Sequence, residues 1–225
     1  MSERRRGHGE AGAPHGVADL RAAGGTRTDQ KRQAITEAAT GLFLRQGYEG
    51  TSMDEIAAAA AVSKQTVYKQ FTDKEQLFAT IVTAITERAE RIAETINALV
   101  DEIVDLEAGL VQLARAYTTA VVQPPVVQLR RLVISEADRF PVLARTYYQR
   151  APARGIAALA GGLERLAGRQ LLRIDDATTA AEQFAYLVLG PVIDRALFDP
   201  GAPIEDSEIA RYAAAGVRVF VAAYT

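Results

Sequence analysis

Polar and basic side chains suited to binding a nucleic acid lie close together between Ser63 and Lys69. In a helix over residues 64–71, Val67 and Phe71 lie one turn apart and are expected to pack inward. The outward face then carries amide, hydroxyl and ammonium groups and no carboxylate. Such groups bind base edges and phosphates in a major groove. The sequence therefore predicts DNA contacts from Ser63, Lys64, Gln65, Thr66, Tyr68 and Lys69.

Catalytic and metal-binding chemistry lacks the residues that it needs. The chain has no cysteine, and its two histidines, His8 and His15, lie in the N-terminal segment, outside the expected folded region. Neighbouring carboxylates such as Asp54 and Glu55 point about 100° apart on a helix, which does not make an acid and base pair. A serine with a lysine base has no supporting motif. We expect no enzyme, no metal site and no cofactor.

Two short helices joined by a tight turn would position the predicted contacts. Ser52 and Glu55 have the spacing of a capping box at the start of the first helix. Ser63 is a suitable N-cap for the second. The segment from Ser52 to Phe71 therefore predicts a helix-turn-helix, with the second helix as reader and Ser52 as a further DNA contact.

A long helix is expected to follow the reader helix. Thr72 and Glu75 form a second capping box, which places Lys74 in the first turn of a helix that runs to about Leu99. A lysine at this end opposes the helix dipole, and a bound phosphate would relieve the mismatch. Lys74 is therefore predicted to contact the DNA backbone.

The stretch AITEAATGLFLRQGYEGTSMDEIAAAAAVSKQTVYKQFTDKEQLF lies within residues 28–81 and resembles the DNA-binding domain of the TetR family of transcriptional regulators. One residue departs from the family pattern. Ala61 stands where such domains usually have glycine, which predicts backbone strain if that position needs a positive φ. Further along, LRRLVISEADRFPVLARTYY, residues 129–148, resembles the C-terminal domain of the AefR-like subgroup.

Composition and pattern favour an all-α fold of about nine helices. The chain has 225 residues, of which 48% are hydrophobic, and no tryptophan. We expect a disordered N-terminal arm (1–27), a three-helix, homeodomain-like helix-turn-helix domain (28–81) and a helical ligand-sensing and dimerisation domain (82–225). The arm contains no apolar core for a signal peptide. It either grips phosphates or is a solvated tail with no role.

The last two expected helices suggest a partner surface. The helix over residues 175–198 is apolar on all sides and is predicted to be buried all round, yet it is too short for a membrane span. The helix over 206–223 carries an apolar stripe. The resemblance implies that these helices form a four-helix interface with a second subunit, and an ordinary intrachain core is the alternative.

The resemblance also implies a cavity for an unknown small-molecule effector in the helical body. Aromatic side chains are the first candidates to line it, because tyrosine has an apolar body and a polar end. The alternative is that they are ordinary core or surface residues. Arg130, Arg131, Glu136 and Arg139 are instead expected to form ion pairs. The candidate ligand-binding residues are Tyr117, Tyr147, Phe184 and Tyr186.

These inferences predict a cytoplasmic, homodimeric transcriptional regulator, a repressor that a ligand releases from a palindromic double-stranded operator. Net charge of −2 gives no general attraction to DNA, so binding would depend on local placement of basic groups. No interaction with a membrane is expected. Two other classes remain open: a protein that grips DNA without sequence choice, and a small-molecule enzyme with a similar helical fold.

Overall fold

Ten helices form the part of the chain described by the computed structural model, residues 26–199 and 201–225, in which the side chains of 85–91 are not described. The predicted all-α class is confirmed, with one helix more than expected. Residues 1–25 of the predicted arm lie outside the described residues. The helices are α1 Arg27–Gln46, α2 Met53–Ala59, α3 Lys64–Gln70, α4 Lys74–Asp101, α5 Leu106–Val121, α6 Pro124–Ser135, α7 Pro141–Arg150, α8 Pro152–Gly168, α9 Ala177–Phe198 and α10 Asp206–Tyr224.

A complete break in helical geometry separates the neighbouring helices α7 and α8. Ala151 has φ −119° and ψ −78°, which ends α7, and α8 begins at Pro152. A residue before proline is disfavoured in helical geometry, and proline suits the first turn of a new helix. α7 and α8 are therefore two helices and not one bent helix.

Local caps define most of the other helix ends. Gly47 has φ +76°, a conformation that favours glycine, and ends α1. The expected cap of α4 is shifted by one residue. Asp73, not Thr72, accepts the N–H of Gln76 at 2.7 Å, and the Thr72 N–H is bound by the Gln76 side chain. An aspartate is the stronger N-cap, and both residues still lie at the start of α4.

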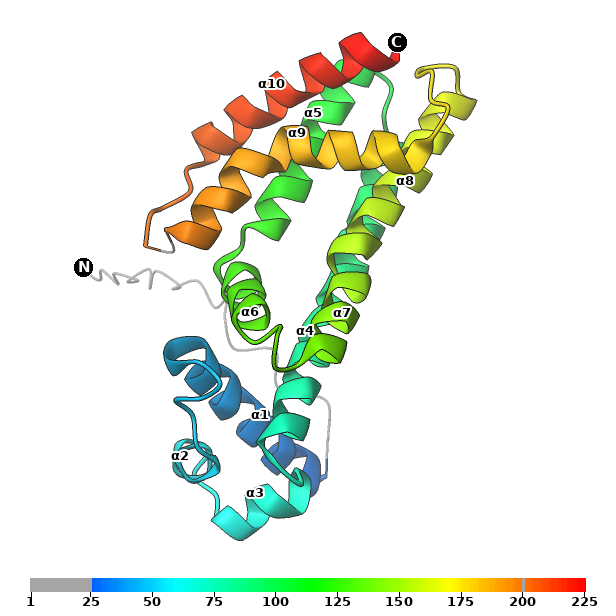
Figure 1. Ribbon diagram of the computed structural model, residues 1–225. Coiled ribbons are helices and arrows are strands. Elements are labelled where there is room, and N and C mark those ends of the chain that lie inside the picture. The colour runs from blue at the N-terminus through cyan, green and yellow to red at the C-terminus, as the bar shows by residue number, and fades with distance from the viewer. Residues whose placement is uncertain (1–25, 200) are drawn as a thin grey trace, which may run out of the picture.

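α4 is the element that connects the two ends of the molecule (Figure 1). Its N-terminal part packs against α1 and α7, and its C-terminal part packs against α5 and α8. α9 and α10 pack against each other at the end farthest from α3. A tilt of α4 would therefore move the helix-turn-helix relative to the body.

The hydrophobic core consists of two clusters of buried side chains. The larger one joins α4, α5, α8, α9 and α10. The smaller one contains the interior of α1 to α3 and the start of α4, together with Leu129, Leu132 and Val133 of α6 and Tyr147 of α7. The predicted domain boundary at residue 81 lies inside the continuous helix α4. Packing of the DNA-binding end thus extends into the body.

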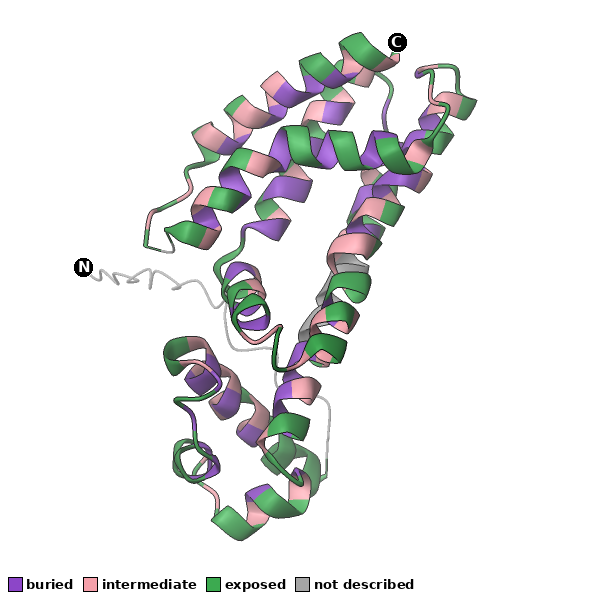
Figure 2. Ribbon diagram, in the orientation of Figure 1, coloured by how far each residue is buried: buried purple, intermediate pink, exposed green. Residues whose placement is uncertain are grey.

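α9 is not buried all round, contrary to the sequence-based prediction. Tyr186 is 73% exposed and Leu187 is 37% exposed, although Val188 beside them is fully buried. Green segments on α9 and α10 mark this exposed side in Figure 2. Large apolar side chains of α9 are thus left uncovered by the described chain, although Glu182, Gln183 and Asp194 of the same helix are also exposed. Among the described residues, no helix has the length and apolar character needed to cross a membrane.

Candidate DNA-binding surface

Contacts on its buried side and at both ends hold the reader helix α3 in place. Val67 and Phe71 are fully buried, as predicted from their spacing. Ser63 caps the N-terminus by accepting the N–H of Thr66 at 3.2 Å, as predicted. At the other end, Arg32 of α1 donates to the Gln70 carbonyl at 3.0 Å, and its guanidinium lies 4.3 Å from the Phe71 ring centroid. These contacts hold α3 in one orientation.

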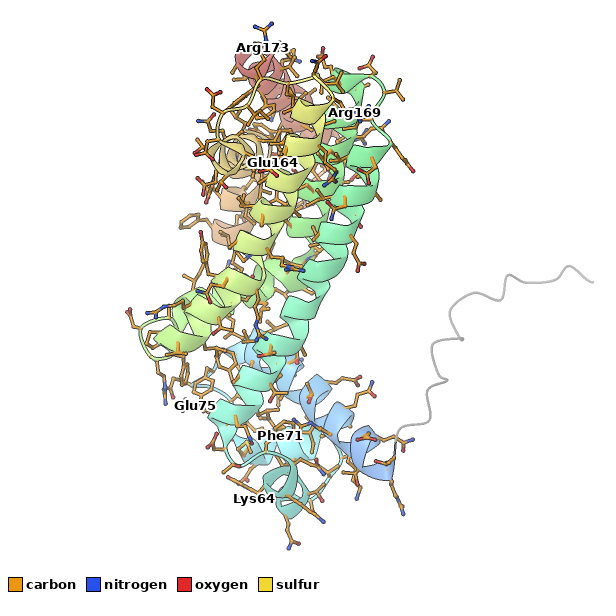
Figure 3. The ribbon with its side chains drawn as sticks, turned by 90° about the vertical axis from the view of Figure 1, so that its right-hand side faces the viewer. Lys64, Phe71, Glu75, Glu164, Arg169 and Arg173 are labelled. Atoms are coloured by element: carbon orange, nitrogen blue, oxygen red, sulfur yellow. The ribbon has the colours of Figure 1, made fainter. Side chains whose placement is uncertain are left out.

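The outward face of α3 presents the predicted polar groups at the tip of the molecule. Gln65, Tyr68 and Lys69 are exposed, with Tyr68 at 46%. Thr66 is half-buried, and its hydroxyl lies 2.8 Å from that of Ser63. In Figure 3 Lys64 lies near the lower end of the molecule, and the buried Phe71 lies above it. The structure therefore brings six of the predicted contacts together.

Lys64 has a partner inside the helix-turn-helix. Its ammonium forms an ion pair with Asp54 of α2 at 2.8 Å, and both side chains are more than half exposed. Hydrogen bonding to Asp54 raises the pKa of Lys64. An ion pair in solvent is weak. A phosphate could therefore bind this ammonium as well, and would share it with the Asp54 carboxylate.

The turn between α2 and α3 depends on an alanine in the left-handed region. Ala61 has φ +52°. Its N–H donates to the Ala58 carbonyl at 3.1 Å, and the Val62 N–H donates to the Ala57 carbonyl at 3.0 Å. This is the hydrogen-bond pattern of a Schellman C-cap, which favours glycine. The backbone strain predicted at this position is confirmed.

Ser52 and Lys74, the remaining predicted contacts, both have structural partners. The Ser52 hydroxyl accepts the Glu55 N–H at 3.2 Å, and the Ser52 N–H donates to the Glu55 carboxylate at 2.8 Å, which confirms the capping box. The Lys74 ammonium donates to the carbonyls of Tyr48 and Thr51, both at 2.8 Å. Burial lowers the pKa of Lys74. Two of its three N–H groups are therefore used to close the loop between α1 and α2.

An aromatic cluster beside Lys74 joins this end to the body, and the sequence did not reveal it. The buried Tyr48 ring stacks on Phe43 at 5.6 Å and meets Phe140 edge-on at 4.8 Å. Arg139 lies over the Tyr48 ring and forms an ion pair with Glu49. Arg139 and Phe140 lie between α6 and α7, about 90 residues from Tyr48 in the chain. Only their aromatic and cationic character could have indicated such a contact.

Three of the four predicted ligand-binding residues line one cavity of about 390 Å³ between α6, α7 and α9: Tyr117, Tyr147 and Tyr186. Phe184 does not line it. That ring is fully buried and packs edge-on against Phe220 at 5.1 Å, on the side of α9 that faces α10. Helical phase explains the difference, because Phe184 and Tyr186 lie about 200° apart around α9.

Arg130 was predicted to form ion pairs, and the structure contradicts this. It lines the cavity beside Tyr117 and Tyr147, is half-buried, and forms no hydrogen bond or ion pair with any described residue. Arg131 instead donates to the Leu197 carbonyl at 2.7 Å. Helical phase turns these neighbours in different directions. Among the described residues, no group of three or more histidine or acidic side chains could hold a metal ion.

Comparison with known proteins identifies the arrangement. Residues 35–81 match the family described as bacterial regulatory proteins of the tetR family. Residues 108–225, more than half of the chain, match the C-terminal domain of AefR-like transcriptional repressors. The chain belongs to the TetR family of transcriptional regulators. This TetR regulator is a DNA-binding transcription factor and not an enzyme.

Individual relatives agree with this assignment. A TetR-family regulator of known structure from Mesorhizobium loti MAFF303099 is 38% identical, with a TM-score of 0.81, over 89% of this chain and 99% of that one. The structure of the flavonoid-responsive regulator FrrA is 34% identical, with a TM-score of 0.66, over 88% of this chain and 98% of that one. The transcriptional repressor AcnR of Corynebacterium efficiens is 33% identical over 91 residues, 40% of this chain and 42% of that repressor. Alignments with the curated relatives thus cover less than half of their length.

Proposed function

We propose that this TetR regulator represses transcription as a homodimer on a near-palindromic operator and leaves the DNA when a small molecule binds its helical body. It would act in the bacterial cytoplasm, where the chromosome lies. Residues 28–81 would bind DNA and residues 82–225 would sense the ligand and form the dimer. The observation that carries the proposal is the carboxylate-free, exposed face of α3, supported on a fully buried Val67.

The side chains on this face divide into two roles. Gln65 is exposed and forms no hydrogen bond or ion pair with a described residue, so it would read a base edge in the major groove. Tyr68 and the N-terminal hydroxyls would bind phosphates, which fixes the helix on the DNA without choosing a sequence. Lys69 would contribute positive charge to both base reading and phosphate binding. Ser52, Ser63, Lys64, Thr66 and Lys74 complete the set, with the third N–H of Lys74 directed to phosphate.

Gel shift and footprinting on DNA upstream of the gene and its neighbours would test this division. Gln65→Ala should change the preferred sequence, by about 1–3 kcal/mol at one base pair. Tyr68→Phe should weaken binding to all sequences alike. Gln149→Ala removes the same amide from an exposed position of α7 and should change neither the preferred sequence nor the affinity for DNA. Binding that is equal on every sequence would contradict the operator and favour a protein that grips DNA without choice.

The uncovered apolar side of α9 and α10 supports the dimer. Leu187 of α9 and Val219 of α10, 57% exposed, lie at the end of the molecule opposite α3. A two-fold axis through this side would direct both reader helices toward the same face of the DNA. Two such helices fit successive major grooves when they lie about 34–36 Å apart. One helix-turn-helix alone contacts too few base pairs to find a site.

Val219→Glu should therefore convert the dimer into a monomer, because it places a charge in an apolar interface. Light scattering at micromolar concentration would measure twice 24.2 kDa for the wild type and 24.2 kDa for the variant. Val104→Glu makes the same change at a loop position that is 90% exposed and should leave the dimer intact. A monomeric wild type would contradict the proposal.

Ligand release is supported by residues shared between the cavity and the DNA-binding end. Val133 and Tyr147 line the 390 Å³ cavity and also belong to the buried cluster that contains α1 to α3. A ligand that displaced α7 would therefore shift Phe140 and, through it, Tyr48. Release follows if the ligand binds the shifted state more tightly. Because FrrA is a flavonoid-responsive relative, aromatic compounds are a natural first screen for loss of operator binding.

A further inference from the structure

Several cavities between the helices share Tyr117 as a wall residue. A cavity of about 330 Å³ between α4, α5 and α6 has Tyr117 in its wall, and so does the 390 Å³ cavity between α6, α7 and α9. A smaller space of about 50 Å³ is also lined by Tyr117 and adds Arg130 and Tyr147. Tyr117 therefore stands where the 330 Å³ and 390 Å³ cavities approach each other, with Arg130 beside it.

The wall of the 390 Å³ cavity is mainly apolar. Buried Val133, Leu189 and Ile193 form part of its wall. Ile134 and Tyr148, each 60% exposed, lie on the same cavity from α6 and α7, and Tyr186 joins them from α9. Large exposed apolar side chains gathered around an opening suit an apolar ligand.

Two polar groups in this wall have no partner among the described residues. Arg130 is a half-buried cation to which no carboxylate or carbonyl of a described residue is bound. The Tyr117 hydroxyl makes no hydrogen bond, and burial raises the pKa of Tyr117 to about 12, so it remains a proton donor at neutral pH. Partly desolvated donors of this kind are costly unless an acceptor binds them, and a cation is best matched by an anion.

Acidic residues near the cavity do not fill this role. Glu182 and Asp194 of α9 also line it, but both are exposed to solvent and neither forms an ion pair with Arg130. Water screens exposed carboxylates, whereas the half-buried guanidinium keeps more of its field inside the cavity. The acidic groups therefore lie toward the solvent side and the unpaired cation toward the interior.

We propose that the effector is an amphipathic anion, whose acidic group is held by the Arg130 guanidinium and the Tyr117 hydroxyl and whose apolar body lies between α6, α7 and α9. The inference rests on the proposed ligand-released function and specifies the chemistry of its ligand. The apolar body is aliphatic or aromatic, and the two kinds are separate arms of the test.

Calorimetric titration of the full-length protein tests the proposal directly, with no DNA present. The aliphatic probes are decanoate, 1-decanol and decylamine, and the aromatic probes are biphenyl-4-carboxylate and biphenyl-4-methanol. At least one of the acids should bind more tightly than its matched alcohol, and decylamine more weakly than decanoate. Arg130→Met should weaken binding of that acid roughly tenfold to a hundredfold and leave the alcohol unchanged, since a hydrogen bond to a charged group is lost.

Two further variants separate this site from a general effect on the fold. Tyr117→Phe removes only the hydroxyl and should weaken the acid severalfold, about the effect of one hydrogen bond. Arg115→Met makes the same change as Arg130→Met at an exposed position of α5 outside the cavity and should leave both affinities unchanged.

The inference is overturned if neither acid binds below millimolar concentration, if an alcohol or the amine binds better, or if Arg130→Met weakens acid and alcohol equally. Operator binding in a gel shift is independent of these titrations. A protein that binds its operator and is released by an uncharged compound would contradict the anionic ligand while leaving the proposed function intact. A protein that binds the acid but no operator would contradict the proposed function alone.

Discussion

Ala61→Gly should stabilise the protein, although it removes a side chain from the functional end. An L-residue in the left-handed region costs roughly 1–2 kcal/mol. Glycine removes this cost but adds about 0.4–1 kcal/mol of backbone entropy to the unfolded chain. The expected net gain is about 0.5–1 kcal/mol, because Ala61 is exposed and the methyl group makes no buried contact. For a chain of this size the midpoint of thermal unfolding should rise by about 1–4 °C.

Urea denaturation, with thermal unfolding as a second measurement, would determine the free energy of unfolding. The matched control is Ala59→Gly, two residues earlier and still in the helical part of α2, which should lose about 1 kcal/mol. Affinity for the operator should stay within about twofold, less than ~0.5 kcal/mol, since the two hydrogen bonds that form the turn are retained. If both glycine variants were destabilised equally, the strain assigned to Ala61 would be wrong.

Three other substitutions test contacts described above. Lys74→Met should cost about 1–3 kcal/mol in urea denaturation, because two loop carbonyls lose their donor, whereas Lys69→Met at an exposed position should cost almost nothing. Gly216→Ala should cost about 1–3 kcal/mol, since its Cβ would lie 2.9 Å from the Leu187 backbone, and thermal unfolding would measure the loss. The raised pKa of Tyr117 means that the folded state holds this proton more tightly than the unfolded state. This contribution to the free energy of unfolding is therefore complete below pH 10 and is lost as the pH rises toward 12, by about 3 kcal/mol in total. In Tyr117→Phe the free energy of unfolding should decline less steeply over the same pH range.

Local signals in the sequence account for most of the DNA-binding end. Caps at Ser52 and Ser63, the buried pair Val67 and Phe71, and the strained Ala61 all depend on residues within one or two helical turns. Spacing along the chain determines such features. The same reasoning failed by one residue at Thr72, where two adjacent residues could both act as a cap.

Contacts between distant segments could not be predicted in the same way. Lys74 was expected to face phosphate, yet its ammonium is bound by carbonyls 23 and 26 residues away. Arg130 was expected to pair with its neighbours, yet α6 directs it to a cavity. Helical periodicity gives the direction of a side chain around its own axis, but the element that meets it there depends on the packing of the whole chain. Helical phase alone predicts that Phe184 and Tyr186 point about 200° apart, but packing determines that Phe184 meets Phe220 of α10 while Tyr186 lines the cavity.

The shared packing of the DNA-binding end and the body limits how such regulators can be recombined. Leu129, Leu132 and Tyr147 complete the cluster that supports α1 to α3, although they lie far beyond the end of the helix-turn-helix in sequence. A chimera joined at residue 81 would place a foreign surface of α6 and α7 beneath this cluster. Transfer of operator specificity to another family member would therefore require the matching faces of α6 and α7 to be exchanged together with α1 to α3.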